Sequence, residues 1–183
     1  CTLKCNLSCL HCGSDCRTTS HMQDMPLADF PSVLDDVRSV MDANTILVVT
    51  TGGEPLVRKD ICACGRAIRE RGFHWGMVSN GMLLDSKMCN HLINAGLETI
   101  AISLDGFEDT HNWLRGSENS FVMAERAIKT LVNKDVTWDV ITCVNQKNFD
   151  CLDSFKQHLI NIGVRYWRIF TIVPMGRAVT NDE

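Results

Sequence analysis

Short apolar runs alternate along the chain with longer stretches of amphipathic character. The runs are rich in β-branched and aromatic residues, which is typical of buried strands. They cover residues 46–49, 75–78, 99–102, 136–144 and 167–173, with residues 1–4 as the stub of a first strand. Between them, apolar side chains recur at the 3.6-residue spacing of amphipathic helices. These helical stretches cover residues 30–41, 61–68, 88–92, 121–131 and 152–159.

Strands that alternate with helices predict an α/β fold with a parallel sheet and right-handed crossovers. Counting the stub, six β/α units are present, so we expect a partial (β/α)6 barrel rather than a full eightfold one. We expect its first strand and final helix to be truncated. The 183 residues suffice for one domain, 1–183, with its own core. The first residue is Cys rather than Met, and we interpret the chain as a piece of a longer protein.

Unusual residues follow each of the predicted strands. Active sites of parallel α/β folds form where strands end and loops lead into helices. The segments at these ends are Cys5 to Cys16, Thr51-Gly52-Gly53-Glu54-Pro55, Ser79-Asn80-Gly81, Ser103-Leu104-Asp105-Gly106, Asn145 and Pro174-Met175-Gly176-Arg177. We therefore expect one rim of the sheet to gather them into a site.

Composition narrows the classes of partner. The net charge is −4 and no cluster of Lys and Arg is present, which argues against nucleic acid and anionic membrane. No apolar run approaches the roughly 20 residues that span a bilayer. Ten cysteines occur in a chain that has ordinary core composition and no signal-peptide pattern. We therefore expect a cytoplasmic protein whose thiols are reduced and have a metal role.

Three of these cysteines are closely spaced, as Cys5-x3-Cys9-x2-Cys12. Three thiolates within eight residues can bind one face of an iron–sulfur cubane and leave the fourth iron open for catalysis. The alternative is a zinc knuckle with Cys1 or Cys16 as fourth ligand. Zinc ribbons usually bring two separated C-x2-C pairs, and this loop has only Cys9 and Cys12. The spacing therefore favours the cluster.

The loop Cys5-Asn6-Leu7-Ser8-Cys9-Leu10-His11-Cys12 resembles the signature of the radical S-adenosylmethionine (SAM) superfamily. Thr51-Gly52-Gly53-Glu54-Pro55 resembles the glycine-rich motif of that family. The segments 103–106, 113–116 and 173–177 are similar to the subgroup of anaerobic sulfatase-maturating and related peptide-modifying enzymes, the SPASM type. The resemblance covers the whole chain.

This resemblance implies a [4Fe-4S] cluster bound by Cys5, Cys9 and Cys12, with SAM chelating the open iron. It implies an oxidoreductase-type enzyme in which one electron splits SAM to a 5′-deoxyadenosyl radical that abstracts hydrogen from the substrate. An electron donor such as flavodoxin or ferredoxin is implied as partner. We expect a peptide or protein substrate, with a small-molecule cofactor precursor as the alternative. A zinc-stapled module without enzymatic activity is the alternative of a different class.

The resemblance also implies roles for residues of the first two motifs. His11 is expected to lie near the adenine of SAM, or else to be a surface histidine. Gly52 and Gly53, next to Thr51, are expected to let the backbone approach the cofactor and to offer exposed N–H groups. Glu54 is expected to accept a hydrogen bond near the methionine amino group, or simply to begin a helix.

Later residues complete the expected set. Ser103 is expected to contact the ribose or the methionyl end, and Arg115 to pair with the SAM carboxylate, because a guanidinium matches that geometry. Asn80 and Asn145 are candidate contacts to adenosine, or turn residues, and Met175 a weaker candidate at the adenine. We assign no acid–base residue. The SPASM subgroup usually continues into a cysteine-rich domain with auxiliary clusters, and we expect residues 1–183 to be a fragment without that domain.

Overall fold

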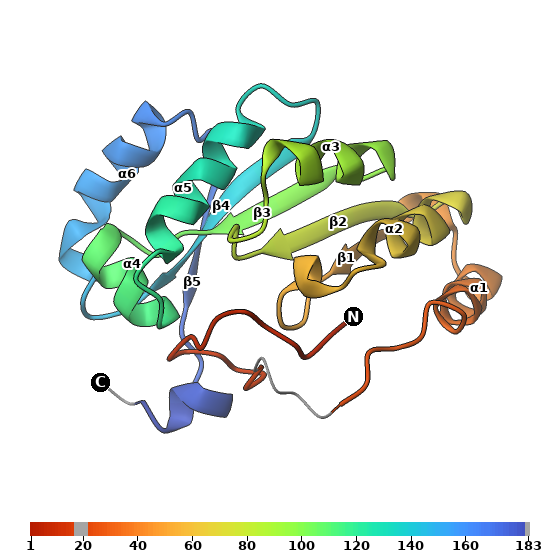
Figure 1. The fold of residues 1–183 in the computed structure, drawn as a ribbon, viewed down its shortest axis with the longest axis horizontal. Helices are drawn as coiled ribbons and strands as arrows, with labels where there is room; N and C mark the ends of the chain where they lie inside the picture. Colours follow the sequence, from red (N-terminus) through yellow and green to blue (C-terminus); the bar gives the residue numbers. More distant parts are fainter. Residues whose placement is uncertain (17–21, 182–183) are drawn as a thin grey trace.

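The computed structural model describes residues 1–16 and 22–181, in which five parallel strands form one open sheet in chain order (Figure 1). The strands are β1 (Leu47–Thr50), β2 (His74–Ser79), β3 (Thr99–Ser103), β4 (Thr137–Val144) and β5 (Trp167–Thr171). Each strand pairs in parallel register with the next, as between Val48 and Trp75. The predicted first strand is present as one parallel bridge between Thr2 and Gly52. The predicted partial barrel is confirmed.

Helices connect the strands and cover one face of the sheet (Figure 1). They are α1 (Phe30–Val40), α2 (Ile61–Glu70), α3 (Ser86–Asn94), α4 (Glu108–Arg115), α5 (Ser120–Leu131) and α6 (Leu152–Asn161). Short 3-10 helices lie at η1 (Ala43–Thr45), η2 (Pro55–Val57), η3 (Phe149–Cys151) and η4 (Gly176–Val179). Five α-helices were predicted, and α4 was not.

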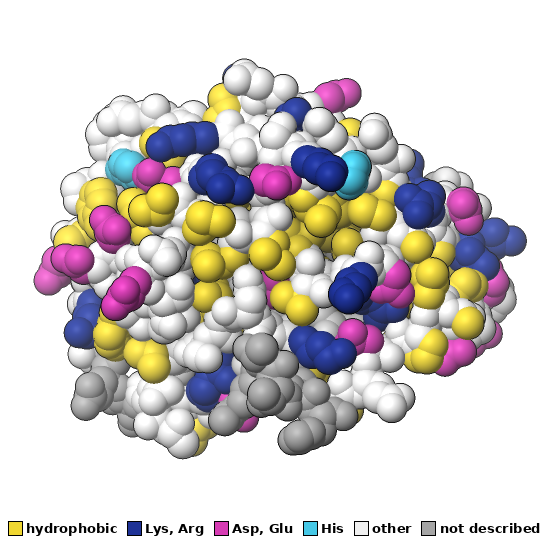
Figure 2. All heavy atoms as spheres, in the orientation of Figure 1, with side chains coloured by type: hydrophobic (Ala, Val, Ile, Leu, Met, Phe, Trp, Pro, Cys, Tyr) yellow, Lys and Arg dark blue, Asp and Glu magenta, His cyan; other side chains and the backbone are white. Residues whose placement is uncertain are grey.

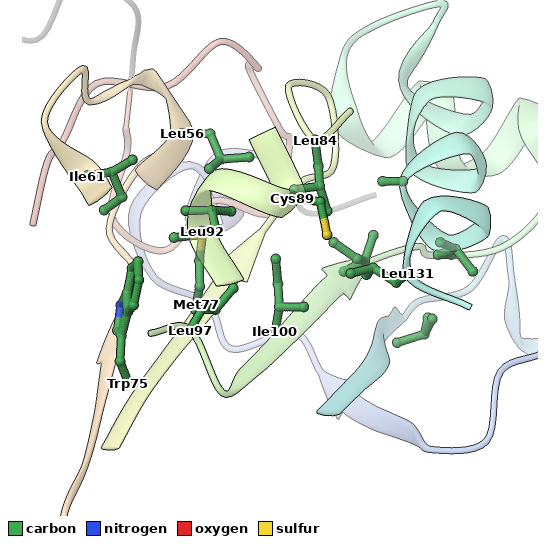
Figure 3. Packing of buried hydrophobic residues seen from close by; sticks show 14 of the residues in the cluster. Leu56, Ile61, Trp75, Met77, Leu84, Cys89, Leu92, Leu97, Ile100 and Leu131 are labelled. Carbon is green, nitrogen blue, oxygen red and sulfur yellow. The ribbon is translucent and has the colours of Figure 1, made fainter. Parts of the chain in front are cut away.

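The core lies between the helices and the sheet. Trp75 and Met77 of β2 are buried there with Leu92 of α3 and Ile128 of α5. Figure 3 shows Met77, Leu92 and Leu97 close together beneath α3. Burying a large apolar side chain stabilises the fold by about 1.5–3 kcal/mol, so this layer holds the strand ends in place.

The surface is mixed in charge on the face drawn in Figure 2, where Lys and Arg are interspersed with Asp and Glu around a band of apolar side chains. Within residues 1–16 and 22–181, no helix has the length and apolar character required to cross a bilayer.

Candidate functional site

One cavity of about 240 Å³ lies at the carboxyl ends of the strands, where the sequence predicts a site. Its lining comes from the loops after the first-strand stub, β1 and β2, from the ends of β2 and β3, and from α4 and η4. The lining residues are Cys5, Cys9, His11, Cys12, Gly13, Ser14, Cys16, Thr51, Gly52, Gly53, Glu54, Val78, Ser79, Asn80, Ser103, Arg115 and Arg177. Segments far apart in the sequence thus meet at this rim, as expected.

The cysteine loop presents several thiols to this cavity. Cys5, Cys9 and Cys16 are buried and Cys12 is half-buried. None of the ten cysteines, all in the described part of the chain, is in a disulfide. Burial raises the pKa of the Cys5 thiol, and burial together with Cys12 and Cys5 raises that of Cys16 to about 11. Such thiols stay protonated until a metal displaces the proton, because metal ligation requires thiolate.

The cysteine ligands can be compared with what zinc and an iron–sulfur cluster require. A tetrahedral zinc with bonds of about 2.3 Å holds its sulfurs roughly 3.8 Å apart. Among the described residues, one group of three or more potential ligands gathers its ligand atoms within 4.8 Å, and it consists of His11, Asp105 and Cys143. Cys5, Cys9 and Cys12 do not form such a group, so these three cysteines make no preformed tetrahedral site within the described part of the chain. Three thiolates are the ligands that iron–sulfur clusters take. The donor set therefore fits an iron–sulfur cluster.

The glycine-rich loop packs closely against the backbone of the N-terminal segment, at Thr2 and Lys4. A Cβ at Gly52, whose φ is +137°, would lie 2.2 Å from the carbonyl oxygen of Thr2, and one at Gly53 would lie 2.0 Å from that of Lys4. The N–H of Gly53 donates to Thr2 and that of Glu54 to Lys4, at 2.7 and 2.9 Å. The expectation of exposed N–H groups is therefore wrong for Gly53. Close approach is needed because the cysteine-bearing segment is fixed against this loop.

Glu54 is almost fully buried and joins two of the loops. Its carboxylate accepts hydrogen bonds from Leu56 N, Ser79 Oγ and Asn80 N at 3.1, 2.9 and 2.8 Å. Burial raises the pKa of Glu54, although these donors and Arg115 oppose the shift. Glu54 lines the cavity while it holds the loop after β1 to the loop after β2.

Arg115 ends α4 with its guanidinium buried beside the cysteine loop. Its Nε donates to Asp105 Oδ2 at 2.6 Å, and its Nη1 lies 3.8 Å from Cys9 Sγ. Burial alone would raise the pKa of Asp105, but the charge of Arg115 holds it well below the usual range. The same charge disfavours a cation between His11, Asp105 and Cys143, since a guanidinium already binds that carboxylate.

His11 lines both this cavity and a second one of about 380 Å³. Burial lowers the pKa of His11 to about 4, and its Nδ1 is buried without a hydrogen-bond partner in the described structure. Trp113, Asn145 and Ile172 are among the residues that line the second cavity.

Of the other predicted residues, all but Met175 line one of the two cavities. Thr51, Asn80 and Ser103 line the first, although the Asn80 side chain also binds Asn6 Oδ1 and Met82 N. Asn145 lines the second, and its Oδ1 accepts from Lys147 N as in a turn. Met175 is exposed and lies outside the lining of both.

Sequence reasoning did not assign Arg177, which anchors the cysteine loop. Its Nε donates to Cys9 O at 2.8 Å, and its Nη1 donates to Asp15 Oδ1 and Cys16 O. Its backbone N–H donates to Cys12 O, so η4 lies directly on the loop (Figure 1). Gly176 permits this contact, because a Cβ there would lie 2.4 Å from Cys12 O. Arg177 belongs to the motif 173–177, but nothing in the sequence indicates that its guanidinium binds the cysteine loop.

Comparisons with known proteins agree with this geometry. The chain is 26% identical over 183 residues to an AdoMet-dependent heme synthase of Methanosarcina barkeri, covering all of this chain and 52% of that protein. It is 27% identical over 162 residues to an Fe-coproporphyrin III synthase of the same organism, covering 85% and 40%. The chain thus spans about half the length of these curated relatives or less.

Solved structures share the fold. The anSMEcpe structure with bound AdoMet and Kp18Cys peptide superposes with a TM-score of 0.81 at 17% identity, covering 94% of this chain and 49% of that one. Such identity supports the fold alone. The family model for the Radical SAM superfamily matches residues 1–159, and the members of this family use a [4Fe-4S] cluster and SAM. With that match over most of its length and three cysteines on the cavity rim, the chain belongs to the radical SAM superfamily.

Proposed function

We propose that this chain is a catalytic core that binds a [4Fe-4S] cluster through Cys5, Cys9 and Cys12 and SAM at the remaining iron. The observation that carries the proposal is that one cavity gathers these cysteines with the loops after β1 and β2 and the end of β3. When bound, cluster and SAM together supply a 5′-deoxyadenosyl radical, formed with an electron from a donor such as flavodoxin or ferredoxin. The protein's contribution is to bind, orient and shield.

The two cavities suggest how SAM is bound. Ligand sites usually measure roughly 300–1,000 Å³, so the first cavity alone is small for a nucleoside cofactor. We infer that the methionyl end lies in the first cavity, against Glu54, Ser103 and Arg115, with Thr51, Gly52, Gly53 and Asn80 completing the wall. The adenine then lies past the His11 ring, toward Asn145 and the second cavity. A neutral His11 suits this place, because an uncharged ring packs on a base without the cost of a buried charge.

Anaerobic reconstitution with iron and sulfide tests the chemistry. The reduced protein is expected to release 5′-deoxyadenosine from SAM, and Cys5→Ala, Cys9→Ala and Cys12→Ala are each expected to abolish that release. Cys151→Ala is the matched control, because Cys151 is exposed and is not among the residues that line the cavity. A colourless protein that binds one zinc through the three cysteines would contradict the proposal.

For the substrate, the names of the relatives favour the cofactor-precursor alternative. Heme synthase and Fe-coproporphyrin III synthase both denote tetrapyrrole chemistry. We therefore propose an iron tetrapyrrole as the first substrate class to test. A peptide is the second candidate, because the fold matches a structure that contains one.

Substrate class can be measured with the full-length protein. Fe-coproporphyrin is expected to increase 5′-deoxyadenosine formation over the substrate-free rate and to be changed in mass. A peptide candidate encoded near the same gene is assayed in parallel. Stimulation by the peptide and none by the porphyrin would reverse the order of the two candidates.

A further inference from the structure

The buried ion pair of Asp105 and Arg115 points directly at a cluster ligand. Both side chains are buried, Asp105 completely. Arg115 Nε is 2.6 Å from Asp105 Oδ2, and from the same guanidinium Nη1 donates to Cys9 Sγ at 3.8 Å. A guanidinium is planar and rigid, so the hydrogen bond from Nε to Asp105 fixes the direction in which Nη1 points.

Asp105 is itself held from several directions. Its Oδ1 accepts from Cys143 N at 2.9 Å, and its backbone oxygen accepts from Asn148 Nδ2 at 2.7 Å. Its backbone N–H donates to His111 Nδ1 at 3.0 Å. These partners lie on β4, on the loop after it and on α4. The carboxylate is therefore a fixed anchor, and Arg115 cannot easily turn away from Cys9.

Reduction adds one negative charge to an iron–sulfur cluster. Hydrogen bonds to the ligand sulfurs and nearby positive charge stabilise that added charge and raise the reduction potential. The effect is larger in a buried site, where the effective dielectric constant is low. Within the ion pair, the cationic guanidinium is the group that contacts the sulfur.

We propose that Arg115 raises the reduction potential of the cluster through its N–H···S contact with Cys9, and that Asp105 is the positioning residue for Arg115. This inference rests on the proposed function, since it requires the cluster. It concerns electron uptake before any substrate is bound, and it is separate from pairing of Arg115 with SAM.

The test is a redox titration of the reconstituted protein without SAM, in which electron paramagnetic resonance measures the amount of reduced cluster at each potential. Hydrogen bonds that involve a charged group are roughly twice as strong as those between neutral groups. Arg115→Met is therefore expected to lower the ratio of reduced to oxidised cluster at a fixed potential at least about tenfold, which is 59 mV for one electron. Arg115→Lys is expected to lower this ratio as well, because a lysine ammonium lacks the planar geometry to donate to Asp105 and Cys9 at the same time. An unchanged potential in both fully loaded variants would overturn the proposal.

A double-mutant cycle tests the part of Asp105. If Asp105 acts through Arg115, then Arg115→Met changes the potential less in an Asp105→Asn background than in the wild type. The double variant also avoids leaving a buried carboxylate unpaired, so it is the form most expected to fold. An equal effect of Arg115→Met in both backgrounds would overturn the positioning role.

The pair of Arg168 and Asp139 offers the matched control, because it joins β5 to β4 near the opposite ends of the strands. Arg168→Met with Asp139→Asn is expected to leave the potential unchanged. Failure of the wild type to take up a cluster would contradict the proposed function itself. A loaded cluster that is insensitive to Arg115 would contradict this inference alone.

Discussion

His111 illustrates how one buried side chain makes stability depend on pH. Its Nδ1 lies 3.0 Å from Asp105 N and 3.4 Å from Asp105 Oδ2. A backbone N–H can only donate, so Nδ1 is the acceptor and the ring is neutral. Burial lowers the pKa of His111, although Asp105 opposes the shift. Below the ordinary value of about 6.5 the unfolded chain binds a proton that the folded chain does not, so stability falls as pH falls.

We expect His111→Asn to remove the part of this pH dependence that His111 contributes, because an Asn oxygen can accept from Asp105 N without titrating. His11, whose pKa is lowered to about 4, keeps its own part. One proton difference corresponds to a slope of about 1.4 kcal/mol per pH unit at most. Urea unfolding of the cluster-free protein between pH 7.5 and 5.5 measures the slope. His91→Asn is the control, since His91 is exposed. Equal slopes in the wild type and His111→Asn would contradict the assignment of a neutral ring.

Glu54 is the second residue whose burial matters. Its three donors, from Leu56, Ser79 and Asn80, all point at the carboxylate. In Glu54→Gln one oxygen becomes an NH₂ group and faces a donor, which costs about 1–3 kcal/mol of unfolding free energy. Urea unfolding measures the loss, with exposed Glu70→Gln as control. A loss no larger than that of the control would mean that the loop rearranges around the amide.

At the scale of elements, α2 depends on one glycine for its contact with β2. A Cβ at Gly65 would lie 2.1 Å from the Trp75 ring, and Trp75 is fully buried (Figure 3). Ala is the better helix former, but overpacking a core costs about 1–3 kcal/mol or more. We therefore expect Gly65→Ala to destabilise the protein, as thermal unfolding would show. Arg66→Ala on the same helix is the control, because Arg66 is exposed. An unchanged or raised melting temperature would refute the packing argument.

Most of the elements that the sequence predicted bury an apolar face, whereas β5 was predicted although its Ile169 and Phe170 are exposed. α2, α3, α5 and α6 follow a hydrophobic period, and the five strands agree with their runs to within about two residues. Helix α4 was missed because its buried face is largely polar. His111 and Arg115 face Asp105 there, and of their apolar neighbours only Leu114 is fully buried. Periodicity cannot reveal a helix whose inner side binds a carboxylate.

At the scale of the whole molecule, the rim was predictable and its internal hydrogen bonds were not. The alternation of strands and helices places every loop after a strand at one edge, and that alone brings Cys5, Thr51, Ser79 and Ser103 together. Single side chains such as Asn148, which donates to both Asp105 O and Cys143 O, carry no such signal. Of the two partners, Cys143 is 5 residues from Asn148 along the chain but Asp105 is 43, and only the folded chain shows that contact.

The cysteine loop and η4 together join the two ends of the chain, which leads to a test of ligand removal. Leu10 N donates to Leu114 O, and Arg177 N to Cys12 O. A cluster bound by the loop stabilises the folded state, because the unfolded chain lacks the site. Hydrogen exchange of the loaded protein is therefore expected to slow at residues 5–16 and 174–180, with little change in β3, where strand pairing already protects the amides.

Arg177→Gln is expected to weaken this protection and speed iron loss, whereas exposed Arg126→Gln is not. Equal slowing throughout the sheet would show that the cluster stabilises the fold globally, and the local coupling argued from Arg177 would then be wrong.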